Sequence, residues 1–170
     1  LAVICKLFGV LNFRGISRKD YLLIAIGGAC LVYNWLFLFM SYQKISLSLG
    51  TVVYHIKPFI ILLVGAFLFR DRLTADTVLW TLIAFVGTFL VVEIDFSEFS
   101  LESERMIGIA YAVIAAVMYS ASTLIVKYVN KVPGILIALI QTALGVLLLL
   151  PFASLTDLSL SDDSWIFILT

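Results

Sequence analysis

The sequence predicts an all-α integral membrane protein, built as a bundle of several transmembrane helices. Hydrophobic residues make up 63% of the 170-residue chain and charged residues only 13%. Soluble domains are nearer half apolar and a quarter charged, so a soluble fold of this size could not bury so much apolar surface. The long apolar runs are also continuous, whereas the strands of a membrane β-barrel alternate apolar with polar residues.

Five apolar stretches are long enough to be transmembrane helices. A hydrocarbon core of about 30 Å requires about 20 mostly apolar residues in a helix. The chain meets this length at residues 21–43, 47–69, 75–94, 106–128 and 133–152. The shorter apolar runs at 1–13 and 164–170 are expected to be the end of an earlier helix and the start of a later one. We therefore expect a fragment of a longer, multi-pass protein.

Basic residues gather in every second loop, and this fixes the expected orientation. Cytoplasmic loops of membrane proteins carry an excess of Lys and Arg. The loops at 14–20, 70–76 and 127–132 hold most of these residues, whereas the alternate loops hold only Lys44 and Arg105. The loops at 14–20, 70–76 and 127–132 are therefore expected in the cytoplasm, and the membrane is expected to be the inner, cytoplasmic one.

The longest complete loop, "EIDFSEFSLESER", covers residues 93–105. It lies on the opposite side from the basic loops and is expected to separate two halves of the protein. The segment 96–105 is therefore expected to be an extracytoplasmic connection.

The stretch 47–69 is unusual because polar residues lie near its middle. On a helical wheel, Tyr54, His55, Lys57 and Pro58 fall within one arc of roughly 160°, and apolar residues fill the other side. Such a polar face requires protein or water beside it. Pro58 cannot donate to the carbonyl of Tyr54 and its ring clashes there, so a kink is expected.

Lys57 is the most informative of these residues. A lysine near the middle of a membrane costs about 2.5–3.5 kcal/mol on the insertion scale, and such charges usually serve a function. Lys57 is therefore interpreted as a group that contacts an anion or couples transport and faces a cavity. The alternative is a structural lysine held by carbonyls or a carboxylate, although no acidic residue lies at similar depth in the five spans.

His55 has two interpretations of equal weight. Imidazole can change its charge between pH 5 and pH 8, which allows a proton-handling role. A neutral histidine that donates one hydrogen bond is the alternative. On an ideal helix His55 and Lys57 lie about 200° apart, so we expect that they do not touch, although they could flank one cavity from its two sides.

Three polar residues in other spans are weaker candidates for substrate binding. Asn34, Tyr119 and Gln141 each lie within a span, on a face that also carries small residues. Small-residue faces often mean close helix packing, and Asn or Gln often bond across helices. Both interpretations stay open.

Several function classes lack support in the sequence. The net charge is zero, so nothing indicates nucleic acid as a partner. No nucleophile elbow, carboxylate pair within a span or phosphate-binding glycine loop occurs, so no enzyme and no cofactor is expected. The two cysteines and the single histidine form no metal-ligand spacing, so no metal is expected either.

Residues 46–92 resemble the EamA-domain permeases of the drug/metabolite transporter superfamily. The segment "SLSLGT" enters a helix with a central proline, "YHIKPF", and "LLVGAFLFRDRLTADTVLWTLIAFVGTFLVV" follows. Pro58, Gly65, Gly87 and the turn at 71–74 match the pattern of the family. Two departures occur: Arg70 and Asp71 stand where the family usually has Gly-Glu, and Trp80 where a glycine is common.

The resemblance implies a secondary transporter of ten helices in two inverted five-helix repeats. Residues 1–95 would run from the end of the second helix through the fifth, and 106–170 from the sixth to the start of the eighth. The protein would move a small metabolite, amino-acid-like or anionic, with export favoured. Its substrate would contact Lys57, His55, Tyr54 and Asn34, with Tyr119 and Gln141 as further candidates.

The sequence leaves open whether protons are coupled through His55 and whether the protein is a homodimer. A non-transporting membrane assembly or receptor subunit is the main alternative function, and an intramembrane enzyme is a weaker one. The expected partners are the lipid bilayer and a small-molecule substrate.

Overall fold

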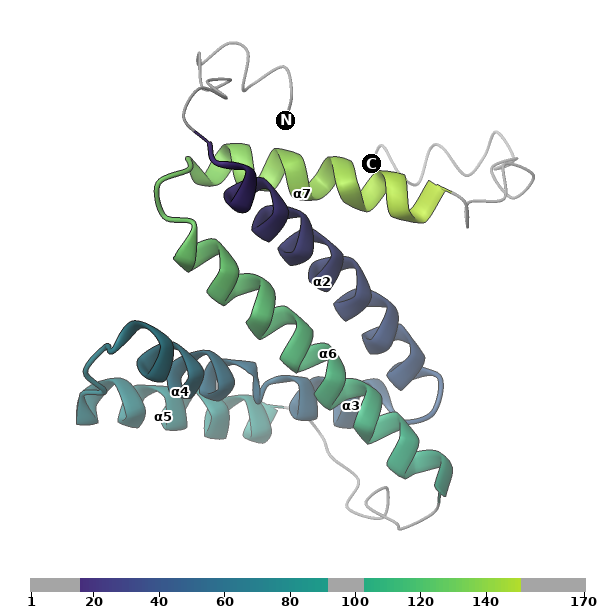
Figure 1. The fold of residues 1–170 in the computed structure, drawn as a ribbon. Helices are drawn as coiled ribbons and strands as arrows, with labels where there is room; N and C mark the ends of the chain where they lie inside the picture. Colours follow the sequence, from purple (N-terminus) through teal and green to yellow (C-terminus); the bar gives the residue numbers. More distant parts are fainter. Residues whose placement is uncertain (1–15, 92–102, 151–170) are drawn as a thin grey trace, which may run out of the picture.

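The computed structural model describes residues 16–91 and 103–150, and all regular structure in these ranges is helical (Figure 1). The terminal runs at 1–13 and 164–170 lie outside the described residues, as does most of the 93–105 loop. The helices are α2 (Arg18–Tyr42), α3 (Leu47–Tyr54), α4 (Lys57–Phe69), α5 (Ala75–Val91), α6 (Ser103–Tyr128) and α7 (Gly134–Leu149).

The helices follow the predicted spans in order. Arg18–Tyr42, Leu47–Phe69 and Ser103–Tyr128 are long and apolar enough to cross a membrane. α5 and α7 are apolar but shorter, with 17 and 16 residues in the described ranges. At 1.5 Å per residue these two helices reach only about 24–26 Å. Large apolar side chains are widely exposed on the outside, such as Phe67 and Leu90 at 86% and 77%, as expected for surfaces that face lipid.

α2 and α6 form the centre of the fold. They lie side by side and run in opposite directions, α7 crosses the first half of α2, and α3 and α4 cross α6 (Figure 1). Small residues allow this approach: Gly108, Ala112, Ala115 and Ala116 of α6 are all buried. Close packing at small residues is the usual way in which helices associate in lipid, where no hydrophobic effect drives them together.

The stretch 47–69 is broken into two helices. α3 ends at Tyr54 and α4 begins at Lys57, so that Pro58 lies in the first turn of α4. The N–H groups in the first turn of a helix have no acceptor within the helix. A proline in this turn, which lacks an N–H, therefore breaks no helical hydrogen bond. His55 and Ile56 form the turn between the helices, and the His55 N–H donates to the carbonyls of Thr51 and Val52.

Two ion pairs link loops that were assigned to the same side of the membrane. Lys127 pairs with Asp71, and both belong to loops predicted to be cytoplasmic. Lys44 pairs with Glu104 at 3.6 Å at the other end of α6. The described contacts therefore group the loops in the way that the distribution of Lys and Arg predicts.

Candidate functional site

The ammonium of Lys57 lies against the faces of two tyrosines. Its Nζ is 3.8 Å from the ring centroid of Tyr54 and 4.7 Å from that of Tyr119. The two rings meet edge to face, with centroids 6.2 Å apart and planes at 74°. Tyr54 ends α3, Lys57 begins α4 and Tyr119 comes from α6, so the helix break and α6 together form the site. A cation over an aromatic face is stabilised by about 0.5–2 kcal/mol.

Asn34 joins this site from α2 and is completely buried. Its side-chain amide is oriented with the nitrogen toward hydrogen-bond acceptors, because only in this orientation do both the nitrogen and the oxygen of the amide have hydrogen-bond partners. The nitrogen then donates to the hydroxyl of Tyr54 at 2.9 Å and to the carbonyl of Ala115 at 3.0 Å. Asn34 thus fixes the orientation of the Tyr54 ring, against which the ammonium of Lys57 lies. It also links α2, α3 and α6.

Ser120 supports the helix break, although no pattern in the sequence singled it out. Its hydroxyl donates to the carbonyl of Ala116 at 2.7 Å and lies 3.3 Å from the carbonyl of Lys57. The role of Ser120 depends on how α4 packs against α6, so the spacing of residues within α6 could not predict it.

No carboxylate pairs with Lys57 among the described residues. The ion pairs of Asp71 and Glu104 are made with other lysines, outside the middle of the spans. Aromatic faces attract the charge of an ammonium but take up little of its hydrogen-bonding capacity, since lysine has three N–H donors. Lys57 can therefore bind an anionic group without breaking an existing ion pair.

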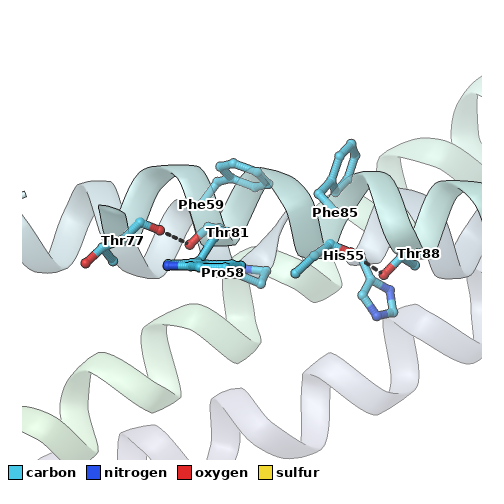
Figure 2. A pocket seen from close by; sticks show the side chains of 9 residues that line it. His55, Pro58, Phe59, Thr77, Thr81, Phe85 and Thr88 are labelled. Carbon is cyan, nitrogen blue, oxygen red and sulfur yellow. Dashed lines mark hydrogen bonds between the residues drawn. The ribbon is translucent and has the colours of Figure 1, made fainter. Parts of the chain in front are cut away.

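His55 lies on a different side of the break from Lys57. With Pro58 and Phe59 it lines a cavity of about 480 Å³ between the α3–α4 segment and α5, and Lys57 does not line this cavity (Figure 2). The two residues therefore do not flank one cavity. A helical wheel assumes a continuous helix, whereas α3 ends before His55 and Ile56 and α4 begins after them.

Gln141 is also separate from the lysine site. It lies in α7, where its side chain packs against Gly27 and Gly28 of α2 and lines a groove with Trp35. Its Nε2 is buried and has no hydrogen-bond partner among the described residues. Four of the six candidates, Asn34, Tyr54, Lys57 and Tyr119, thus come together, while His55 and Gln141 lie elsewhere.

Comparison with known proteins decides the family. The model of the EamA-like transporter family matches residues 1–93, which is more than half of the chain. The chain belongs to the EamA-like transporter family. The resemblance predicted from residues 46–92 is therefore confirmed, as is the prediction of membrane-spanning helices in a transporter family rather than an enzyme.

One curated relative of this EamA chain is the "Uncharacterized transporter YxxF" of Bacillus subtilis (strain 168). The two sequences are 36% identical over 155 residues, which cover 91% of this chain and 50% of the relative. The chain therefore spans about half the length of that protein. No solved structure matches the chain. Family and relative agree with the predicted placement in a membrane as a multi-pass protein.

Proposed function

We propose that the full-length protein is a secondary transporter that carries a small metabolite with a negatively charged group, and that Lys57 contacts this group. One observation carries the proposal: a lysine in the middle of a span, held by two tyrosine rings, has no acidic partner among the described residues. Placing a charge in the middle of a membrane costs free energy, and such charges usually mark a pathway for a substrate or an ion.

The neighbours of Lys57 have distinct roles in this proposal. Tyr54 and Tyr119 hold the ammonium in place, and the bond from Asn34 fixes the orientation of Tyr54. A carboxylate that approaches the ammonium would gain a charge-assisted hydrogen bond. Such a site favours a carboxylate-bearing, amino-acid-like metabolite, and the resemblance to exporting permeases favours export.

The helices are proposed to form two inverted repeats, residues 1–95 and 106–170, joined by the connection at 96–105. The family match over residues 1–93 supports this division. In this arrangement α2 belongs to the first repeat and α6 to the second, and the lysine site lies where they meet. Rocking of the repeats would open the site to each side in turn. Proton coupling and a homodimer stay predictions.

Counterflow in proteoliposomes tests the proposal with full-length protein. A set of labelled amino acids is compared with their methyl esters, which lack the carboxylate. Lys57→Arg keeps the charge and is expected to retain part of the exchange, whereas Lys57→Gln is expected to lose at least about tenfold, the loss expected for one charge-assisted hydrogen bond. Equal exchange by the wild-type protein and Lys57→Gln would refute the role of the lysine.

A further inference from the structure

The cavity between the α3–α4 segment and α5 is lined by polar groups together with aromatic rings. Its wall on α5 carries three threonines, Thr77, Thr81 and Thr88, spaced along the helix (Figure 2). His55 and Pro58 form part of the opposite wall. A volume of about 480 Å³ is within the range of sites for small molecules, which are mainly apolar with a few polar groups.

The hydroxyls of Thr81 and Thr88 present acceptors to this cavity, because their protons are already donated within α5. The Thr81 hydroxyl donates to the carbonyl of Thr77 at 2.7 Å, and the Thr88 hydroxyl donates to that of Ala84 at 3.0 Å. Nδ1 of His55 lies 2.7 Å from the carbonyl of Thr51, so this nitrogen carries the proton. In the neutral ring Nε2 is then an acceptor, and it has no hydrogen-bond partner among the described residues.

Aromatic rings supply the remainder of the wall. Phe59 and Phe85 meet edge to face with centroids 5.5 Å apart, and Trp80 lies on the same cavity. Aromatic faces attract cations, and tryptophan does so most strongly. Threonine oxygens, an imidazole nitrogen and aromatic faces together suit a ligand that is positively charged and rich in N–H donors.

We propose that this cavity binds a small organic ammonium ion, whose N–H groups donate to His55 and to one of the two hydroxyls of Thr81 and Thr88. These hydroxyls lie about 10 Å apart along α5, too far for one ammonium to reach both. The apolar part of the ligand packs on Phe59, Phe85 and Trp80. The site is separate from the Lys57 cluster and does not depend on the transport proposed there. Its ligand carries the opposite charge to the one that Lys57 would attract.

Two basic groups lie near this cavity. His55 is the single titratable side chain in the described lining, and α5 contributes none. Lys57 belongs to α4, but its ammonium lies on the tyrosine faces at α6. The described lining of this cavity therefore holds no lysine or arginine that would repel an ammonium ion.

Calorimetry on the full-length protein in detergent tests the site with 2-phenylethylammonium as the probe. The comparison ligands are 2-phenylethanol, which is neutral, and 3-phenylpropionate, which is an anion of similar size. We expect the ammonium to bind at least about tenfold more tightly than either, because hydrogen bonds to a charged group contribute about 1.5–3 kcal/mol. Equal binding of the three ligands would show simple partition into an apolar groove and would overturn the proposal, as would no binding of the ammonium.

Matched variants localise the binding. Thr81→Val combined with Thr88→Val removes two acceptors with little change in shape, and is expected to weaken ammonium binding about tenfold or more. Thr123→Val is the control, because its hydroxyl makes the same kind of bond, to the carbonyl of Tyr119 at 3.0 Å in α6, outside the cavity. Unchanged binding in the double variant, or an equal loss in the control, contradicts the site.

His55 and Lys57 provide two further checks. His55→Leu removes the Nε2 acceptor and is expected to weaken ammonium binding about tenfold or more, and unchanged binding would contradict the role of Nε2. Lys57→Gln removes a nearby positive charge, so it is expected to leave ammonium binding unchanged or tighter. Loss of ammonium binding in Lys57→Gln would refute the separation of the two sites, whatever the variant does to transport.

Discussion

The Nζ of Lys57 lies 3.8 Å from the ring centroid of Tyr54, and the hydroxyl of the same ring accepts a hydrogen bond from the buried amide of Asn34. One tyrosine thus connects an intramembrane charge to the centre of the helix packing. Ring and hydroxyl have separate roles, which substitutions can distinguish.

Tyr54→Phe is expected to preserve the contact with Lys57 but to leave the Asn34 nitrogen with one acceptor fewer. The predicted loss in stability is about 0.5–1.5 kcal/mol, in the range of hydrogen bonds within membranes. Tyr54→Leu also removes the aromatic face and is expected to lower stability further and to weaken exchange. Thermal unfolding in detergent, together with counterflow, measures both effects. Equal behaviour of the two variants would contradict a role for the ring.

Asn34→Leu tests the buried amide itself. Leucine has a similar size but cannot donate to Tyr54 or to the carbonyl of Ala115, so the hydroxyl of Tyr54 loses its donor. We expect a loss of about 1–3 kcal/mol in stability. The lowered unfolding midpoint should be accompanied by weaker substrate exchange, since the tyrosine is no longer fixed. A variant as stable as the wild type would show that these bonds contribute nothing.

Gly28→Ala tests the crossing of α2 and α7. A Cβ at Gly28 would lie 3.3 Å from the Cα of Gln141, and a backbone atom can give way only if the helices separate. The expected loss is about 1–3 kcal/mol. Gly87→Ala in α5 is the control, because nothing lies within 4 Å of its added Cβ. It is expected to be neutral or to stabilise by up to about 1 kcal/mol, since alanine favours helix. Similar losses in both variants would contradict this packing.

The pair of Asp71 and Lys127 connects the two proposed repeats at one end of the fold. Replacing both by cysteines, in a protein without other cysteines, should allow a short thiol cross-linker to join them. We expect the cross-link to block transport, because it holds α6 to the loop after α4. A pair at Thr74 and Thr77, which touch within one segment, is the control. Full transport by protein cross-linked between Asp71→Cys and Lys127→Cys would contradict the proposed rocking.

Hydropathy predicted much of the helical fold, because a run of about 20 apolar residues has few alternatives to a helix in lipid. The predicted span at 21–43 corresponds to Arg18–Tyr42, and that at 106–128 corresponds to Ser103–Tyr128. Pro58 also indicated where the span at 47–69 is interrupted, since the chemistry of proline is local.

The sequence could not predict how side chains are shared between neighbouring helices. The wheel placed His55 and Lys57 on one polar face, but the break turns His55 toward α5 and leaves Lys57 facing α6. The pairing of Asn34 with Tyr54 depends on how α2 and α3 pack, and the role of Ser120 depends on α4. These contacts are set by the tertiary packing of helices distant in sequence.

The most direct test of whether Lys57 faces a transport path is the accessibility of residue 57 to water. Lys57→Cys is made in full-length protein whose other cysteines are replaced, and it is labelled from each side with a small, positively charged, membrane-impermeant thiol reagent. We predict labelling that slows when a transported carboxylate-bearing metabolite is present, because both would occupy the same aqueous path. No labelling from either side, in a protein that remains folded, would show that Lys57 is a buried structural residue and would contradict its proposed contact with the substrate.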